Sequence, residues 1–176
     1  MNLFLKAQII LGFLFFSYSC SNASIENIIA GQTMGTTYNV KIIHSKTIKN
    51  IDQIKYEIDS ILVDINNQMS TWISDSEISI FNKTLSTNSF KISDEFFYVL
   101  EQGKIINKLT DGAFDYTVFS LAATWGFGPD SLRIINNPDD DKLKEILSYT
   151  GSEKILLDYP FIKKTHPNLQ LDLNAI

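Results

Sequence analysis

Apolar residues recur at helical spacing over residues 51–69, and this pattern predicts the strongest helix of the chain. Asn50 or Asp52 is suited to cap its start. The expected apolar face consists of Ile51, Ile54, Ile58, Ile61, Leu62, Ile65 and Met69.

Two further segments have helical patterns. Ser93 precedes two acidic residues that suit a first helical turn, and this helix should end before Thr110. Its apolar positions are Phe96, Phe97, Leu100 and Ile106. A third helix should start at Pro138 with Asp139–Asp141 and stop at Gly151. Its predicted apolar face is Leu143, Ile146 and Leu147.

The rest of the regular pattern has the period of two that is typical of strands. Residues 28–43 predict two strands around a glycine-containing turn, because Tyr38, Val40 and Ile42 alternate with more polar positions. Strands are also expected at 154–157, 161–164 and 169–173, with a turn at 166–168. Helices and strands are mixed without strict alternation, so the predicted fold class is α+β.

The N-terminal residues have the pattern of an export signal. Lys6 is the only charged residue among the first twenty-five, and the apolar run Ala7–Phe16 is too short to span a bilayer. Small residues then precede Cys20, where a bacterial lipoprotein carries its acylated cysteine. We therefore expect a signal peptide over 1–19, a lipidated Cys20, a tether over 20–30 and a folded domain over 31–176. The alternative is an ordinary cleaved signal with an incidental cysteine.

Composition narrows the classes of function. A chain of 176 residues that is 44% hydrophobic can bury the core of one domain, and it is not a disordered chain. A net charge of -5 disfavours a primary nucleic-acid binder. One cysteine excludes a disulfide framework within the chain, and the two histidines, His44 and His166, do not form a ligand pair. The chain has no phosphate-binding P-loop motif and no G-x-G-x-x-G.

Three segments have compositions that suit ligand binding. The first, Thr33–Tyr38, combines a glycine with hydroxyl groups that can hydrogen-bond phosphate or ribose, although a plain β-turn explains it as well. The second, Met69–Asn82, contains Trp72, which is suited either to anchor a core or to stack on a planar ring.

The third segment, Thr110–Gly128, has two carboxylates around a Gly-Ala-Phe turn and then the sequence Trp-Gly-Phe-Gly. Such a loop can offer backbone N–H groups and an anionic acceptor to one ligand. In the alternative interpretation, Asp115 caps a helix over Thr117–Thr124.

Taken together and in this order, the segments resemble the ApbE family, the FAD:protein FMN transferases, also known as thiamine-biosynthesis lipoproteins. The matching segments are Met34–Tyr38, Met69–Trp72, Ser76–Ser79 with Asn82, Thr110–Asp115, Trp125–Gly128 and Leu171–Ile176. The resemblance covers nearly all of the chain after the signal. It implies an α+β fold with a mixed sheet and packed helices, of which this chain would be the N-terminal part.

The resemblance also implies a function. Members of the family cleave Mg²⁺-bound FAD at its pyrophosphate, transfer FMN to a Thr or Ser hydroxyl of an acceptor protein and release AMP. Acceptors include subunits of ion-pumping respiratory complexes of the Nqr and Rnf types, and some relatives mainly hydrolyse FAD. The family's FAD contacts carry over by motif to Met34, Trp72, Ala113, Phe114 and Asp115. The signal would place the protein on the periplasmic face of a bacterial membrane.

Several positions depart from the family pattern. Trp72 stands where Tyr is frequent, Ile80 where Arg is common, and Tyr116 where Pro is usual. The Leu-Asp-Leu segment ends at Ile176, whereas the family continues to the residues that bind Mg²⁺, so we expect truncation and no metal ligand in this chain. A non-catalytic FAD-binding lipoprotein or an inactive remnant is therefore the alternative to an active transferase.

Overall fold

A computed structural model gives the structure of the protein and describes residues 24–44, 50–129 and 138–173. The chain divides into two compact units, Met1–Ile58 and Asp59–Ile176. The predicted signal at 1–19 and the predicted lipidation site at Cys20 lie outside the described residues.

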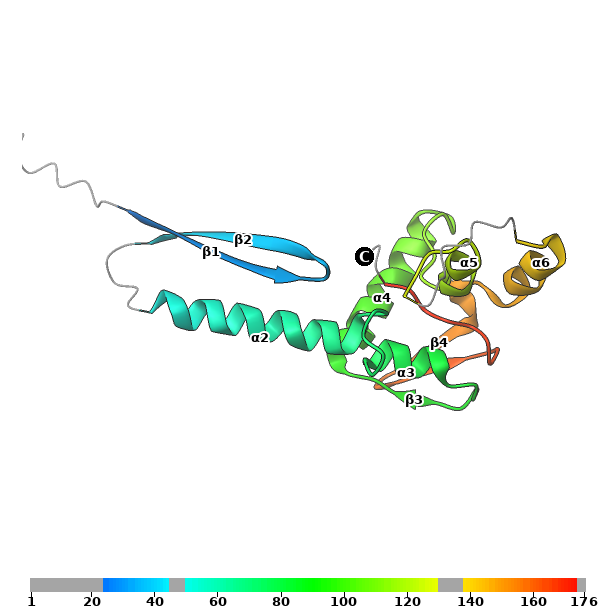
Figure 1. Cartoon of the computed structure of the whole chain (residues 1–176). Helices are drawn as coiled ribbons and strands as arrows, with labels where there is room; N and C mark the ends of the chain where they lie inside the picture. Colours follow the sequence, from blue (N-terminus) through cyan, green and yellow to red (C-terminus); the bar gives the residue numbers. More distant parts are fainter. Residues whose placement is uncertain (1–23, 45–49, 130–137, 174–176) are drawn as a thin grey trace, which may run out of the picture. The chain divides into compact units, whose positions relative to one another are not determined.

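The first unit contains a β-hairpin, as the alternating pattern predicted (Figure 1). Strands β1 (Ile25–Thr33) and β2 (Thr36–His44) pair antiparallel along their whole length, with Thr33 opposite Thr36. Tyr38, Val40 and Ile42 are half-buried, whereas their neighbours in sequence are exposed. Because β1 starts at Ile25, residues 25–30 of the predicted tether are instead part of the hairpin.

The strongest predicted helix is α2 (Ile51–Met69), and its bounds match the prediction. The Asn50 side chain caps its start, since Asn50 Oδ1 accepts a hydrogen bond of 3.1 Å from the Gln53 backbone N–H. The predicted apolar face is half-buried rather than buried, and Ile61 is 58% exposed. Helical spacing therefore located the helix correctly but placed Ile61 wrongly on the covered face.

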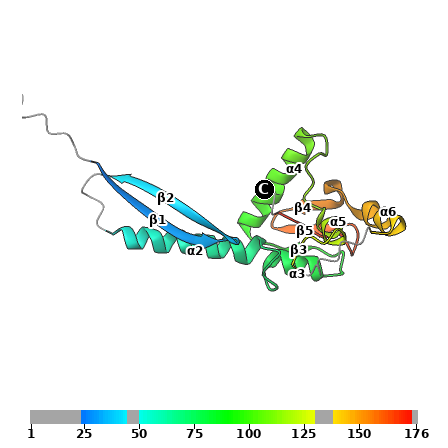
Figure 2. The same cartoon turned by 45° about the horizontal axis from the view of Figure 1, so that its top comes forward.

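The second unit contains a three-stranded antiparallel sheet (Figures 1 and 2). The strand order is β3 (Phe90–Lys91), β5 (Phe161–Lys164) and β4 (Ile155–Asp158). The strands β4 and β5 match the predictions for 154–157 and 161–164 within one residue. The sequence did not predict β3, because a strand of two residues is too short to show an alternating pattern.

Helices pack beside this sheet. The helix α4 (Asp94–Leu109) matches the predicted bounds, and α6 (Asp140–Tyr149) lies within two residues of the predicted start at Pro138 and stop at Gly151. The helix α3 (Glu77–Lys83), the helix α5 (Phe119–Thr124) and the 3-10 helix η1 (Ser152–Lys154) were not predicted at these bounds. Ser76 caps α3 by accepting a hydrogen bond of 3.2 Å from the Ser79 N–H. Seven residues are too few for a helical period to be evident in the sequence.

One hydrophobic core lies between the helices and the sheet of the second unit. Its buried members are Ile78, Phe81, Ile92, Phe96, Phe97, Leu100, Tyr116, Ile146, Tyr149, Ile155, Ile162, Leu169, Leu171 and Leu173. Leu147 does not join it and is 54% exposed, which corrects the predicted apolar face of α6. Tyr149, three residues after Ile146, occupies that face instead.

The segment Leu169–Leu173 is extended but does not form the regular strand that the sequence predicted. Its only described strand-type pairing is a single parallel bridge between Gln170 and Val118. The alternation was correct, since Leu169, Leu171 and Leu173 are all buried. The predicted α+β class is confirmed, and the described ladders within the two sheets are antiparallel.

Candidate functional site

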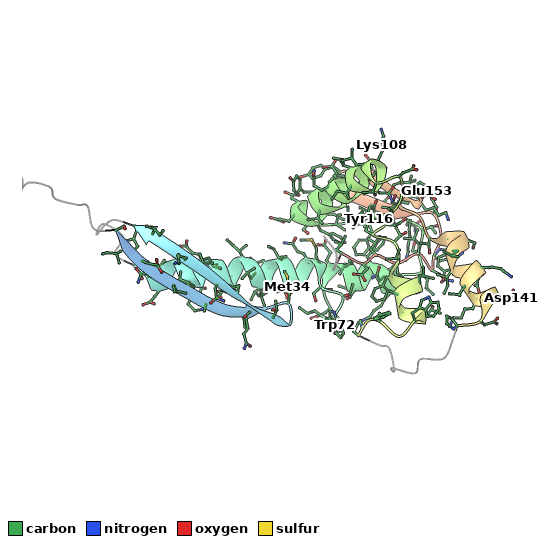
Figure 3. All side chains as sticks on the ribbon, turned by 90° about the horizontal axis from the view of Figure 1, so that it is seen from above. Met34, Trp72, Lys108, Tyr116, Asp141 and Glu153 are labelled. Carbon is green, nitrogen blue, oxygen red and sulfur yellow. The ribbon has the colours of Figure 1, made fainter. Side chains whose placement is uncertain are left out.

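Met34 lies at the tip of the β1–β2 hairpin in the first unit. Met34 and Gly35 both have positive φ, 52° and 70°, as the central residues of a type I′ turn require. The Met34 side chain is exposed, as Figure 3 shows. The glycine that the sequence associated with a turn therefore completes a two-residue hairpin loop.

Trp72 lies in the turn between α2 and α3, and its side chain is 67% exposed. It borders a hollow of about 120 Å³ whose lining is Thr71, Trp72, Ser74, Ser79, Asn82, Lys83, Phe119, Pro129 and Gln170. Complete pockets for small molecules usually measure about 300 Å³ or more. The hollow is therefore smaller than a complete ligand pocket, and the exposed indole at its border offers a face on which a planar ring can stack.

The amide side chains in this lining already have partners within the protein. Both groups of the Asn82 amide bond to the backbone of Leu171, at 2.8 and 2.7 Å. The Gln170 amide accepts from Ser120 Oγ at 2.7 Å and donates to the Asn82 carbonyl at 3.3 Å. These two residues therefore fix the shape of the hollow, while Trp72 and the exposed Lys83 remain accessible to a ligand.

The Trp72 turn is held by the start of α3. Ser76 Oγ donates to the Ser70 carbonyl at 2.6 Å, and Lys83 Nζ donates to the Ser74 carbonyl at 2.8 Å. Glu77 accepts at one oxygen from the Ser93 N–H at 2.7 Å, and its other oxygen lies 2.6 Å from Ser93 Oγ. Ser93 occupies the N-cap position of α4, but its hydroxyl bonds to the Gln68 and Glu77 side chains and not to the helix backbone.

The loop Ala113–Asp115 follows the C-terminal end of α4. Asn107 Nδ2 donates to the Phe114 carbonyl at 2.6 Å, and Thr110 Oγ1 accepts from the Phe114 N–H at 3.1 Å. The Phe114 ring packs against the core, whereas Ala113 is exposed. Both backbone bonds of Phe114 therefore belong to the fold of the loop.

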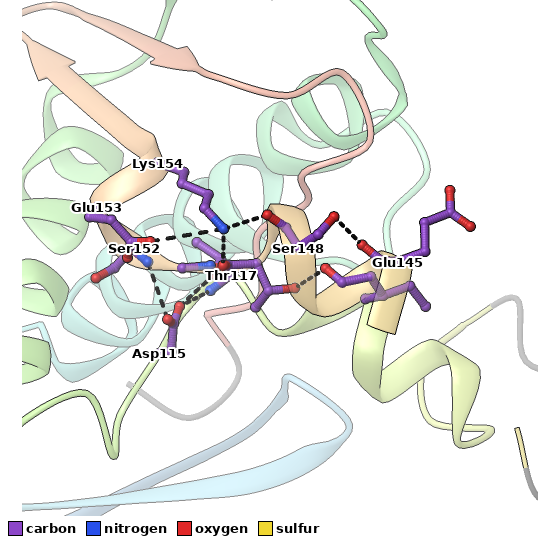
Figure 4. Close-up of polar contacts among 10 residues, drawn as sticks. Asp115, Thr117, Glu145, Ser148, Ser152, Glu153 and Lys154 are labelled. Carbon is purple, nitrogen blue, oxygen red and sulfur yellow. Dashed lines mark hydrogen bonds and ion pairs between the residues drawn. The ribbon is translucent and has the colours of Figure 1, made fainter. Parts of the chain in front are cut away.

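The Asp115 carboxylate is the centre of a hydrogen-bond network, shown in Figure 4. Its Oδ1 accepts from the Thr117 N–H at 2.8 Å and from Thr117 Oγ1 at 2.6 Å. Its Oδ2 accepts from the Ser152 N–H at 3.1 Å, and Thr117 Oγ1 accepts from the Gly151 N–H at 2.7 Å. Asp115 thus joins its loop to the connection between α6 and β4.

This geometry corrects the alternative in which Asp115 caps a helix over Thr117–Thr124. The helix α5 starts at Phe119, and its N-cap position is Val118. The bonds from Asp115 to Thr117 instead form a local turn. Asp115 is therefore a residue that fixes the loop rather than a helix cap.

Two buried polar side chains have shifted pKa values. Burial, followed by the negative charges of Asp115 and Glu153, raises the pKa of Tyr116 above its ordinary value. Burial lowers the pKa of Lys164 to about 8. Lys164 Nζ donates to the Leu169 carbonyl at 3.1 Å and to the Phe81 carbonyl at 3.4 Å, and it lies 4.9 Å from the centre of the Phe81 ring.

The structure does not bring all of the predicted site residues together in one place. Trp72 lines the hollow, but of the described residues around it none comes from the loop Ala113–Asp115. That loop is tied to the hollow indirectly, because the Tyr116 carbonyl accepts from the Asp172 N–H at 2.8 Å and Gln170 belongs to the lining. Met34 lies in the other compact unit. Sequence reasoning did not identify Lys83 or Gln170, since neither belongs to a matching motif.

A metal site is not formed by the described residues. Over residues 24–44, 50–129 and 138–173, no three His, Cys, Asp or Glu side chains lie together in a group that could hold a metal ion. Mg²⁺ in proteins is usually held by one or two carboxylates together with substrate phosphates and water, and no chemical step through the ion is assigned to these residues.

Comparison with known proteins identifies the family. The model of the ApbE family matches residues 34–176. This chain belongs to the ApbE family. The matched range includes Trp72, Asn82 and the Ala113–Asp115 loop, so the hollow and the Asp115 network lie within it.

Curated ApbE proteins resemble the chain in sequence. It is 36% identical over 157 residues to the FAD:protein FMN transferase of Vibrio cholerae, and the match covers 89% of this chain and 47% of that protein. It is 38% identical over 154 residues to the enzyme of that name from Haemophilus influenzae, covering 84% and 44%. The chain thus spans about half the length of these curated relatives.

Solved ApbE structures share the fold. The flavin transferase ApbE from Vibrio cholerae matches with a TM-score of 0.80 and 37% identity, covering 85% of this chain and 48% of that one. The apo form of the Pseudomonas stutzeri flavinyl transferase ApbE matches with a TM-score of 0.82 and 29% identity, covering 87% and 49%. These matches confirm the ApbE-like fold that the motifs predicted.

Proposed function

We propose that this chain contributes part of the FAD site of an FAD:protein FMN transferase, which transfers FMN from FAD to a Thr or Ser hydroxyl of an acceptor protein and releases AMP. The observation that carries the proposal is the family match over residues 34–176, which contains the hollow beside Trp72. Relatives named FAD:protein FMN transferase from two organisms support it.

In this proposal the exposed side chains at the hollow bind the ligand. The Trp72 indole stacks on a planar ring of FAD, which favours binding because the stacked aromatic surfaces leave water. Lys83 brings a positive charge to the same hollow. Its ammonium group has three N–H donors, and its bond to the Ser74 carbonyl uses one of them. The pyrophosphate of FAD is an anion that such a charge attracts.

Met34 and the Ala113–Asp115 loop are proposed as the other FAD contacts. Ala113 is exposed and has no large side chain that would keep a ligand away from the backbone. Asp115 acts mainly by holding the loop, since both of its carboxylate oxygens accept hydrogen bonds from the protein. In a complete enzyme, loss of the Asp115 carboxylate is therefore expected to impair use of FAD.

The Mg²⁺ dependence of the reaction is also part of the proposal. The ion would neutralise charge on the pyrophosphate, and its ligands are expected beyond Ile176, in the half of the relatives that has no counterpart here. The proposed acceptors are flavoprotein subunits of the Nqr or Rnf type.

The proposed location is the periplasmic face of a bacterial membrane, with a lipid anchor at Cys20, and it rests on the pattern of residues 1–20. Among the described residues, no helix is both long and apolar enough to cross a membrane.

Titration of the purified chain with FAD, followed by flavin fluorescence, tests the binding step. We expect quenching on binding, and Trp72→Ala should weaken the affinity roughly three- to tenfold because stacking is lost. Tyr98→Ala is the matched control, since Tyr98 is a similarly exposed aromatic residue on α4. Equal affinities for both variants would contradict the role of Trp72.

Product analysis separates the proposed transferase from the second candidate, a non-catalytic FAD-binding lipoprotein. Chromatography after incubation with FAD, Mg²⁺ and an acceptor subunit measures AMP and acceptor-bound FMN. Quenching without either product would support binding alone, and no quenching would support an inactive remnant.

A further inference from the structure

The Asn82 side chain pairs with the backbone of a distant residue as a neighbouring strand would. Its Nδ2 donates to the Leu171 carbonyl at 2.8 Å, and its Oδ1 accepts from the Leu171 N–H at 2.7 Å. Asn82 is only 6% exposed, and Leu171 is fully buried. Because buried backbone groups need partners, this amide satisfies both backbone groups of Leu171 in place of a neighbouring strand.

On one side, Asn82 is rigidly connected to the Trp72 turn. It lies near the end of α3, whose first residues bind that turn through Ser76 and Ser79, with Ser79 Oγ 3.4 Å from the Ser70 carbonyl. The bond from Lys83 to the Ser74 carbonyl adds a third connection. A displacement of α3 would therefore move Trp72.

The segment around Leu171, which Asn82 holds, is also bonded to the residues that follow the Ala113–Asp115 loop. The Asp172 N–H donates to the Tyr116 carbonyl at 2.8 Å, and Gln170 bridges to Val118. Ser120 Oγ also donates to the Gln170 side chain at 2.7 Å. A displacement of residues 170–172 would therefore move the backbone next to Asp115.

We propose that Asn82 is a positioning residue that couples the Trp72 turn to the Ala113–Asp115 loop through the backbone of Leu171. The inference rests on the proposed function, because it concerns how the two parts of the FAD site are held in register. Asn82 itself does not need to touch FAD, since both groups of its amide are occupied by Leu171.

The substitution Asn82→Asp tests this role with the smallest change in shape. The carboxylate keeps an acceptor for the Leu171 N–H but repels the Leu171 carbonyl at neutral pH. Protonation restores a donor. Burial makes the carboxyl easier to protonate, whereas the Lys164 ammonium, which bonds to the Phe81 and Leu169 carbonyls, acts in the opposite direction. Asn88→Asp is the matched control, because Asn88 is exposed and lies in the loop after α3. Asn82→Leu, which has a similar volume and no polar group, provides a second variant.

Two readouts do not require FAD. In a Trp125→Phe background Trp72 is the sole tryptophan, so its emission reports the turn. Amide hydrogen exchange over residues 113–118 reports the loop. We expect Asn82→Asp and Asn82→Leu to change both readouts at pH 7.5, and Asn82→Asp to recover towards wild type at pH 5. Asn88→Asp should change neither.

FAD affinity provides the functional readout. Asn82→Asp should weaken FAD binding about tenfold at pH 7.5, which is the effect of losing one or two buried hydrogen bonds that hold the site. If the folded variants leave Trp72 emission and exchange over 113–118 as in wild type, the proposal is overturned. Absence of FAD binding by the wild-type chain would contradict the proposed function instead, while emission and exchange would still decide the role of Asn82.

Discussion

At the scale of single residues, Tyr116 shows the effect of a polar group in the core. Its side chain is fully buried, and within the described part of the chain its hydroxyl has no hydrogen-bond partner. Burying a hydroxyl without a partner is unfavourable by about 1–3 kcal/mol. The Tyr116 ring therefore contributes to the core, while its hydroxyl works against the stability of the fold.

We therefore predict that Tyr116→Phe stabilises the protein. The ring would stay in the core while the unpaired hydroxyl is removed, so the free energy of unfolding should increase by about 1 kcal/mol. Urea denaturation followed by circular dichroism measures this change. Tyr98→Phe, on the exposed face of α4, is the control and should have little effect. A loss of stability in Tyr116→Phe would show that the hydroxyl has a favourable partner.

At the scale of elements, Glu77 joins the helices α3 and α4. It lies in the first turn of α3, and its carboxylate accepts from the backbone N–H and faces the hydroxyl of Ser93, the residue just before α4. A carboxylate also interacts favourably with the positive end of a helix dipole. The Ser-Glu-Ile-Ser motif therefore has a structural explanation that does not require a ligand.

The substitution Glu77→Ala should lower the free energy of unfolding by about 2 kcal/mol, because two charge-assisted hydrogen bonds are lost. It should also speed amide exchange at the start of α4. Chemical denaturation and exchange measured by mass spectrometry check both effects. Glu101→Ala, at an exposed position of α4, is the control. Equal denaturation midpoints for the two variants would contradict a structural role of Glu77.

The sequence predicted elements best where a regular pattern was long. The helices α2, α4 and α6 have several turns, and β2 alternates through Tyr38, Val40 and Ile42. The helix α3 and the strand β3 are too short to show a period. The segment Leu169–Leu173 has the alternation of a strand, but alternation reveals which side chains are buried and not what the backbone bonds to.

The candidate site was predictable from motifs more than from periodicity. Motifs led to Trp72 and Asp115 as predicted FAD contacts, and that role stays a prediction. Their different surroundings, an exposed position beside a hollow and a hydrogen-bond network, depend on contacts far apart in sequence. Lys83 and Gln170 were missed for the same reason. Spacing along a chain does not show that residues 82 and 171 are in contact.

At the scale of the whole molecule, one buried cation makes stability depend on pH. Lys164 is 1% exposed, and burial lowers its pKa from 10.5 to about 8. Between these two values the unfolded chain binds a proton that the folded chain does not. Stability contributed by this group therefore increases as pH rises through about 8, and it is lowest below that value.

We predict that the free energy of unfolding of the wild type increases relative to Lys164→Met between pH 7.5 and 9.5, by roughly 2 kcal/mol. This window ends below pH 10, because Tyr116, whose pKa is raised, acts in the opposite direction above it. Urea denaturation at both values measures the difference. Lys163→Met changes a neighbouring exposed lysine and should keep the wild-type pH dependence. The same pH dependence of the free energy of unfolding in both variants would contradict a lowered pKa of Lys164.

The pairing of Asn82 with Leu171 has a consequence for how the sequence can change in evolution. The amide of Asn82 recognises the peptide groups of residue 171 and not its side chain. Position 171 is therefore free to exchange one apolar side chain for another of similar size, whereas position 82 requires a side chain with a donor and an acceptor at this reach. Substitutions at the two ends of this contact should be constrained unequally, even though both residues are buried and each depends on the other.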